Sequence, residues 1–190
     1  AVVEQSKGAL CFPVDPTSRS DATIGGALSC NASGFTPGET GAIRAWVQRV
    51  RLVLPDGSAL DAARGQYVSR DGIFTLAGGD GVAPRAWPVP RYARPPIKNA
   101  GGPYSATDGI LDLVDLVIGS EGLFGLVTAC ELALALRPAK YMDLFFSLPS
   151  ETDALTILRI VRRHYSGDHS GLSAFEYFGV NCRKVMNHET

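Results

Sequence analysis

The chain has 190 residues, of which 45% are hydrophobic and 19% charged, and its formal net charge is -1. This composition is typical of a soluble globular protein, and the length allows one domain and part of a second. The near-zero charge argues against a nucleic-acid partner. The longest apolar run, Leu126 to Leu136, contains Glu131 and is too short for a transmembrane segment.

Cysteines and histidines give no sign of a disulfide or a metal site. The four cysteines form no C-x-x-C pair, and we expect reduced, buried thiols in a cytoplasmic protein. No apolar signal segment accompanies Glu4 and Lys7, which favours the same location. His164 and His169 have no third ligand close in the sequence, so no metal is expected. The cysteines are Cys11, Cys30, Cys130 and Cys182.

The first informative stretch runs from Phe12 to Gly34. It places Pro13 and Pro16 around Asp15 and then continues as T-I-G-G and N-A-S-G. Glycines allow close approach of a ligand, and a turn that opens a helix directs backbone N–H groups at an anion such as a pyrophosphate. The residues therefore indicate a site for a phosphate-bearing cofactor. A glycine-rich surface turn is the alternative, with Asp15 in an Asx-turn before Pro16.

Alternating residues predict a β-rich part after this stretch. Arg44 to Leu54 reads as a half-buried strand, and Pro55-Asp56-Gly57 turns it into a hairpin with Ser58 to Leu60. A weaker hairpin signal joins Tyr67–Ser69 to Ile73–Leu76 around Arg70-Asp71-Gly72. From Ala77 to Pro96 the density of Gly and Pro predicts no regular element. There, Gly78-Gly79-Asp80-Gly81 is expected to be a surface turn, because no Lys-Ser/Thr pair follows it.

The second half is predicted to alternate helices and strands. Apolar spacing predicts a helix from Asp108 to Ile118, ended by Gly119 to Gly122, and then a strand from Leu132 to Leu136. After Pro138 we expect a strand at Tyr141–Leu148, a helix from Glu151 to about Tyr165 behind a capping box, and a strand at Ala174–Phe178. This change of pattern predicts a domain boundary near Arg137-Pro138-Ala139.

Two blocks of sequence resemble one known family. F-P-x-D-P-x-S with T-I-G-G and N-A-S-G, followed by Asp115–Thr128 (D-L-V-I-G-S-E-G-L-F-G-L-V-T), is similar to the FAD-linked oxidase family. Its flavin domain is of the p-cresol methylhydroxylase (PCMH) or vanillyl-alcohol oxidase type. The branch resembled is that of D-lactate dehydrogenase, D-2-hydroxyglutarate dehydrogenase and the glycolate oxidase D-subunit.

The resemblance covers nearly the whole chain and implies an α+β fold. Residues 1–138 would be the C-terminal part of a PCMH-type FAD-binding domain, and residues 139–190 the start of a ferredoxin-like α+β cap or substrate domain. The family's upstream glycine-rich loop and its downstream histidines have no counterpart, so we expect a fragment of a longer protein.

The resemblance also implies which residues bind FAD. The flavin ring is flat and largely apolar, which suits proline and aliphatic walls. A carboxylate can accept hydrogen bonds from ribose hydroxyls, although Glu121 could equally be a solvated residue of a glycine turn. The spacing Gly119, Gly122, Gly125 excludes the G-x-G-x-x-G motif of an NAD site. The implied residues are Pro13, Asp15 and Pro16 along the flavin; Thr23, Ile24, Gly25 and Gly26 beside the pyrophosphate; Ser29, Asn31 and Gly34 as the floor; and Glu121, Gly122, Gly125 and Val127 near the adenosine.

Some positions match the family less well. Lys98 and Asn99 stand where relatives carry a polar pair near flavin or substrate, but Gly101 to Gly109 are inserted after them. Arg44 is expected to be a surface or sheet-edge arginine. Cys30 aligns with a small residue, and no covalent flavin attachment residue is identifiable, so FAD is expected to be non-covalent.

The resemblance implies an FAD-dependent oxidoreductase. Its substrate would be a D-2-hydroxy acid such as lactate, glycolate or 2-hydroxyglutarate, with hydride transfer to flavin N5. The catalytic base is expected outside this chain, and the electron acceptor is not identified. We expect either a homodimer or a subunit of a larger complex. The alternatives are an aldonolactone oxidase or alkyl-ether-lipid synthase type, a non-catalytic assembly subunit, and a separately stable lobe that binds FAD weakly or not at all.

Overall fold

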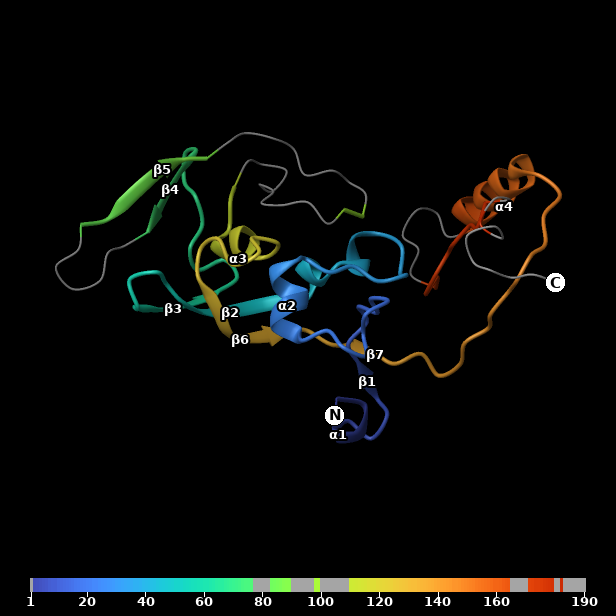
Figure 1. Cartoon of the computed structure of the whole chain (residues 1–190), viewed down its shortest axis with the longest axis horizontal. Coiled ribbons are helices and arrows are strands. Elements are labelled where there is room, and N and C mark those ends of the chain that lie inside the picture. Colours follow the sequence, from blue (N-terminus) through green and yellow to red (C-terminus); the bar gives the residue numbers. More distant parts are fainter. Residues whose placement is uncertain are drawn as a thin grey trace.

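The computed structural model describes residues 2–76, 83–89, 98–99, 110–164, 171–179 and 182. The chain contains both short helices and antiparallel strands, which agrees with the expected α+β class (Figure 1). Among these residues, none of the helices combines the length and the apolar character that a membrane crossing needs.

A three-stranded antiparallel sheet is the centre of the fold. Strand β2 (Val47–Val53) lies between β3 (Ala59–Ala63) and β6 (Leu126–Leu132). The predicted hairpin between β2 and β3 is confirmed. Leu54 N–H donates to Ser58 O at 2.8 Å, and Gly57 takes the positive φ of 84° that the turn requires.

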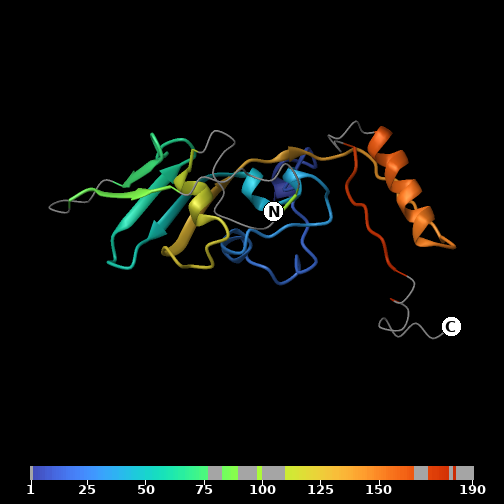
Figure 2. The same ribbon diagram turned by 90° about the horizontal axis from the view of Figure 1, so that it is seen from above.

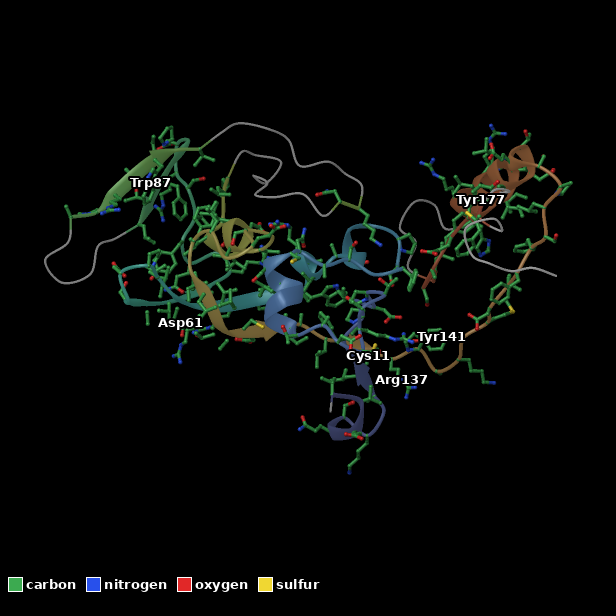
Figure 3. All side chains as sticks on the ribbon, in the orientation of Figure 1. Cys11, Asp61, Trp87, Arg137, Tyr141 and Tyr177 are labelled. Carbon is green, nitrogen blue, oxygen red and sulfur yellow. The ribbon has the colours of Figure 1, made fainter. Side chains whose placement is uncertain are left out.

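The two faces of β2 differ as the alternation predicted. Val47, Val50 and Leu52 are buried in the core, together with residues of α2 (Ile24–Ser29) and α3 (Leu113–Val117). On the other face, Arg49 forms exposed ion pairs with Asp61 at 3.2 Å and Glu131 at 3.7 Å. Asp61 is on the side of the sheet opposite α3 (Figure 3). The core therefore lies between the sheet and the two helices.

Two small antiparallel pairs flank this core. Strand β1 (Leu10–Cys11) pairs with β7 (Ala135–Leu136), and β4 (Ile73–Leu76) pairs with β5 (Arg85–Pro88). The remaining short elements are α1 (Val2–Gln5) and the 3-10 turns η1 (Glu39–Gly41) and η2 (Ile43–Ala45).

The structure corrects the prediction for the glycine- and proline-rich stretch. Residues 85–88 form a strand, because β4 offers a free edge and Phe74 stacks on Trp87 with ring centroids 6.4 Å apart. The weaker hairpin prediction, which paired Tyr67–Ser69 with Ile73–Leu76, is also wrong. Ile73 and Arg70 exchange backbone hydrogen bonds in a tight turn, but Val68 bridges to Asp112 rather than to β4. Gly78-Gly79-Asp80-Gly81 lies outside the described residues.

Two other element boundaries differ from the prediction. Helix α3 begins at Leu113 because the Asp112 carboxylate caps it, accepting from Val114 N–H at 2.8 Å; Asp108 lies outside the described residues. The strand expected at Leu132–Leu136 is divided between two sheets. Leu132 ends β6, and the chain then turns so that Ala135 and Leu136 pair with β1.

The segment after Pro138 agrees with the prediction only in its helix. Helix α4 (Glu151–His164) follows the expected cap, in which Ser150 Oγ donates to Asp153 Oδ2 at 2.6 Å and accepts from Asp153 N–H at 3.3 Å. Tyr141–Leu148 and Ala174–Phe178 are not strands, because neither pairs with another part of the chain that the structure describes.

Helix α4 lies apart from the sheets in both ribbon views (Figures 1 and 2). None of its residues is buried. Tyr177 is close to it (Figure 3). Strand-forming sequences that lack a partner stay exposed, as Phe145 does at 95%. The domain boundary near Arg137 stays a prediction.

Candidate functional site

The first candidate block is built around the start of α2. Thr23 is the N-cap, and its hydroxyl accepts from Gly26 N–H at 3.0 Å. Thr23, Ile24 and Gly26 are exposed and Gly25 is half-buried. Apart from its chain neighbours and the backbone of its own helix, no atom of the described residues lies within 4 Å of the position that a Cβ on Gly25 would take, and its φ is not positive. Neither packing nor backbone conformation therefore explains a glycine at this position.

The second candidate block is the turn that follows α3. Gly119 has φ 80° and Gly122 has φ 84°, so glycine suits both positions. Glu121 lies between them with φ 52°, a left-handed conformation that is unusual for a residue with a side chain. Its side chain is exposed. The turn therefore presents a carboxylate to solvent on a strained backbone, which agrees with the turn interpretation and leaves the carboxylate accessible to a ligand.

Backbone hydrogen bonds join the two blocks, although about ninety residues separate them in sequence. Gly119 N–H donates to Leu28 O at 3.0 Å, and Glu121 N–H donates to Ser29 O at 2.9 Å. Ser29 thus contributes its carbonyl to the junction while its side chain is half-buried. The end of the helix that carries the paired glycines is therefore bonded directly to the acidic turn.

Asp15 and Gly34 lie against each other within the first block. A Cβ on Gly34 would stand 2.5 Å from the backbone N and O of Asp15, so glycine is needed here for packing. The Asp15 carboxylate accepts from Arg19 at 2.8 and 2.9 Å, across four residues and partly in solvent. The structure thus pairs Asp15 with an arginine. Pro13 and Pro16, on either side, are half-buried.

Asn31 lies beneath the block rather than on its surface. It is 0% exposed and takes φ 48°, which asparagine tolerates well. Its Oδ1 accepts from Arg44 N–H at 3.3 Å, while Nδ2 has no hydrogen-bond partner among the described residues. A buried amide donor without a partner is unusual in a folded protein. The first block therefore keeps an unused donor.

The remaining residues of the second block have structural positions. Gly125 has φ 147°, and a Cβ there would meet Val53 O at 2.6 Å, so this glycine allows β6 to approach β2. Val127 is half-buried in β6 opposite Leu52. The packing and pairing of the sheet therefore account for both Gly125 and Val127.

Lys98 is brought to the first block from a distant part of the chain. Its ammonium donates to Gly34 O and to Thr36 O, the latter at 2.8 Å. Burial lowers the pKa of Lys98, and the charge of Glu176 opposes this change. Asn99 is half-buried beside it. The weak candidate Lys98 thus lies beside the floor that was predicted from Asn31 and Gly34.

The expectation of a surface position for Arg44 is wrong. Arg44 is 3% exposed, and its guanidinium donates to Asp115 O at 2.6 Å, Asp115 Oδ1 at 3.2 Å and Ile118 O at 2.8 Å. Asp115 also pairs with Arg64 at 3.1 Å. Sequence reasoning missed this cluster. The available signal was Asp112 and Asp115 within the apolar run from Leu111 to Ile118, since buried carboxylates need partners.

The four cysteines are free thiols, and the expectation that they are buried is wrong, because three are half-buried and Cys30 is exposed. Cys30 is exposed because it follows the last residue of α2 as its C-cap. Burial raises the pKa of the half-buried Cys130 thiol. No group of three or more metal-ligating side chains occurs among the residues that the structure describes.

These residues fit a dinucleotide cofactor such as FAD. Beside Gly25 the described residues leave space for a group as large as a methyl, and the neighbouring residues are exposed. Glu121 offers acceptor oxygens at the junction of the blocks. Apolar prolines with polar groups at the rim suit a flat ring system that carries phosphates.

Comparison with known proteins gives a class for the first block. The family model described as an FAD binding domain matches residues 1–63, which contain every candidate of the first block. This match indicates FAD as the cofactor.

Relatives extend the comparison to the second block. D-2-hydroxyglutarate dehydrogenase from Stutzerimonas stutzeri is 26% identical over 174 residues, 92% of this chain and 28% of its own length. The mitochondrial D-2-hydroxyglutarate dehydrogenase of Bos taurus is 24% identical over 175 residues, 92% of this chain and 25% of its length. A Schizosaccharomyces pombe protein named for mitochondrial D-lactate dehydrogenase is 26% identical over 176 residues, 93% and 26% respectively.

The chain spans about a quarter of the length of these curated relatives. Residues 1–63 are thus similar to an FAD binding domain, and the chain is similar over most of its length to proteins named as D-2-hydroxy-acid dehydrogenases.

Proposed function

We propose that the protein is an FAD-dependent oxidoreductase that oxidises a D-2-hydroxy acid such as lactate, glycolate or 2-hydroxyglutarate. The match to an FAD binding domain supports the cofactor, and the names of the similar dehydrogenases support the substrate class. The observation that carries the proposal is the junction of the two blocks. Its hydrogen bonds, Gly119 to Leu28 at 3.0 Å and Glu121 to Ser29 at 2.9 Å, join the end of α2 to the acidic turn, and this supports a single cofactor that contacts both blocks.

The chain's own residues would hold FAD in distinct ways. Thr23, Ile24, Gly25 and Gly26 would border its pyrophosphate, and Glu121 would accept hydrogen bonds from its adenosine part. Pro13 and Pro16 would provide apolar contact. Bound flavin supplies the two-electron chemistry that accepts a hydride from the substrate carbon. We propose non-covalent binding, and we assign no catalytic base.

Replacing Gly25 by alanine tests the proposed contact with FAD. Outside its own helix, the added methyl group meets no atom of the described residues within 4 Å. Because alanine is the better helix former, the free energy of unfolding should rise by about 0.5–1 kcal/mol. The Kd for FAD should nevertheless rise at least about tenfold, or about 1.4 kcal/mol, because the methyl group occupies the space of the ligand. Both quantities are measured on protein expressed from its complete reading frame, by urea unfolding and by flavin fluorescence quenching. An unchanged Kd would contradict this placement.

The substrate class is tested separately with the same protein. Purified enzyme should show flavin absorbance and should lose it when D-lactate, glycolate or D-2-hydroxyglutarate is added without oxygen. The matching L-enantiomers are the control for the two chiral acids. Bleaching by aldonolactones alone would favour the aldonolactone oxidase type. A protein without flavin bands that does not bind added FAD would favour an assembly subunit.

The proposal also includes the expected cap domain, the position of Lys98 and Asn99, the location and the assembly. Residues 139–190 would begin a cap domain, and Lys98 with Asn99 would lie near flavin or substrate. A cytoplasmic location and assembly as a homodimer or complex subunit also remain proposals.

A further inference from the structure

A buried cluster of charged residues is hydrogen-bonded to the parts of the chain that carry both candidate blocks. Its centre is Arg44, 3% exposed, with Asp115 at 8%. Arg64 completes it, pairing with Asp115 at 3.1 Å and donating to Arg44 O at 3.0 Å. Arg64 also donates to Val47 O at 2.9 Å, which fixes the cluster to strand β2. Two buried or half-buried guanidinium groups thus surround one carboxylate.

Arg44 contacts the parts of the chain that carry both blocks. Its backbone N–H donates to the Oδ1 of Asn31 at 3.3 Å, and Asn31 N–H donates to Leu28 O at 3.0 Å. Its guanidinium donates to Ile118 O at 2.8 Å, and Ile118 immediately precedes the acidic turn. One residue therefore connects the end of α2 with the end of α3.

The carbonyl of Leu28 links the two blocks a second time. Leu28 O receives hydrogen bonds from Asn31 N–H and from Gly119 N–H, both at 3.0 Å. Arg44 bonds to Ile118, whose neighbour Gly119 donates to this oxygen. Arg44 also bonds to Asn31, which donates to the same oxygen. If the guanidinium were lost, the Ile118 carbonyl would lose its bond to Arg44 and the Asp115 carboxylate would keep only Arg64 among the partners shown.

We propose that Arg44 is a positioning residue for FAD, which holds the acidic turn against α2 before the cofactor binds. This inference rests on the proposed function, because it assigns a role in that same site. A site whose parts are already in place binds more tightly, since less conformational freedom is lost on binding. Arg44 does not itself reach the ligand surface; it acts through the carbonyls of Asp115 and Ile118 and the side chain of Asn31.

The test compares Arg44→Lys with Arg49→Lys in protein expressed from its complete reading frame. Lysine keeps the charge but cannot bond the Asp115 and Ile118 carbonyls in the two-pronged geometry of a guanidinium. Arg49, on strand β2, serves as the matched control. Its side chain is half-exposed and forms ion pairs only at the surface among the contacts shown. We expect the Kd for FAD to rise about tenfold or more in Arg44→Lys and to stay within about twofold in Arg49→Lys.

A second readout separates positioning from general destabilisation. Hydrogen exchange of the FAD-free variants should be faster at the amides of Gly119 and Glu121 in Arg44→Lys, while the amides of Val50 and Ala62 in the sheet keep their wild-type rates. Uniformly faster exchange over all four amides would show a merely structural role and would overturn the proposal. So would a folded Arg44→Lys with wild-type Kd.

Further outcomes remain decisive. If Arg44→Lys does not fold, Arg44→Gln replaces it with the same expected changes, because its shorter amide cannot bond the Asp115 and Ile118 carbonyls together. If the wild-type protein binds FAD but both variants bind it equally well, the positioning role fails and the proposed function stands. If wild-type protein binds no FAD, the proposed function fails, and the positioning role fails with it.

Discussion

Glu121 is the residue at which local strain and the proposed ligand contact coincide. Its φ of 52° is left-handed, a conformation that costs an L-residue about 1–2 kcal/mol. The hydrogen bond from its N–H to Ser29 O helps to hold it there. Strained residues of this kind are concentrated at functional sites. The conformation turns an exposed carboxylate toward solvent next to the first block.

Two substitutions of Glu121 separate strain from ligand binding. Both Glu121→Ala and Glu121→Gly remove the carboxylate, so both should raise the Kd for FAD about tenfold, as expected for a lost charged hydrogen bond. Glycine accepts the left-handed backbone, so Glu121→Gly should be more stable than Glu121→Ala by about 1 kcal/mol. Fluorescence titration and urea unfolding measure the two effects. Equal stability of the variants, or a Kd that only the less stable one changes, would contradict this account.

Gly34 provides the structural counterpart to Gly25. The Cβ of Gly34→Ala would lie 2.5 Å from backbone atoms of Asp15, which cannot rotate away as a side chain can. We expect the free energy of unfolding to fall by about 3 kcal/mol, in the upper range for overpacking. Gly25→Ala is the control and should lose no stability. A Gly34→Ala variant as stable as wild type would mean that the segment is packed more loosely than described.

At the scale of elements, the β2–β3 hairpin depends on charge in its turn. Ser58 donates to the Asp56 carboxylate through its hydroxyl at 2.6 Å and its backbone N–H at 2.9 Å. These two hydrogen bonds lower the pKa of Asp56 below its ordinary value of 3.8, and the bond from the Ser58 hydroxyl has the larger effect. A carboxyl group with a lowered pKa adds stability above pH 3.8, and this contribution disappears as the pH falls through the folded-state pKa.

An Asp56→Asn variant tests this linkage. Wild type should be the more stable of the two at pH 7, because only the ionised carboxylate strengthens the two hydrogen bonds. The difference should shrink as the pH is lowered below about 3.8. Urea unfolding of both proteins across this range gives the comparison. A stability difference that is independent of pH would show that the charge of Asp56 has no part in the turn.

Local sequence signals predicted the elements whose partners are close in sequence. Pro55-Asp56-Gly57 identified the hairpin, and Ser150 with Asp153 identified the start of α4. Strand β5 was missed because the many prolines and glycines around it predicted no regular element. The sequence did not show that β4 would pair with it. Tyr141–Leu148 was predicted as a strand, but it pairs with no other part of the chain that the structure describes. Periodicity shows which residues could face a neighbour, but it does not show whether a neighbour is present.

The candidate site was predictable to a similar degree. The motifs identified both blocks, and the structure joins them at Leu28 and Ser29. Residue chemistry could not show that Gly34 and Gly125 are needed for packing, because the atoms they approach, in Asp15 and Val53, are fixed by tertiary structure. Arg44 was misplaced for the same reason: an arginine at the start of a strand pattern is usually exposed, and its partners are more than seventy residues away.

At the scale of the whole molecule, the central claim is that two distant blocks form one FAD site. The most direct measurement is a crystal structure, with FAD bound, of the protein expressed from its complete reading frame. The account predicts that one FAD molecule contacts both Gly25 on α2 and Glu121 on the turn after α3. An FAD molecule that contacts only one of these residues, or that binds elsewhere while the two blocks stay joined, would contradict it.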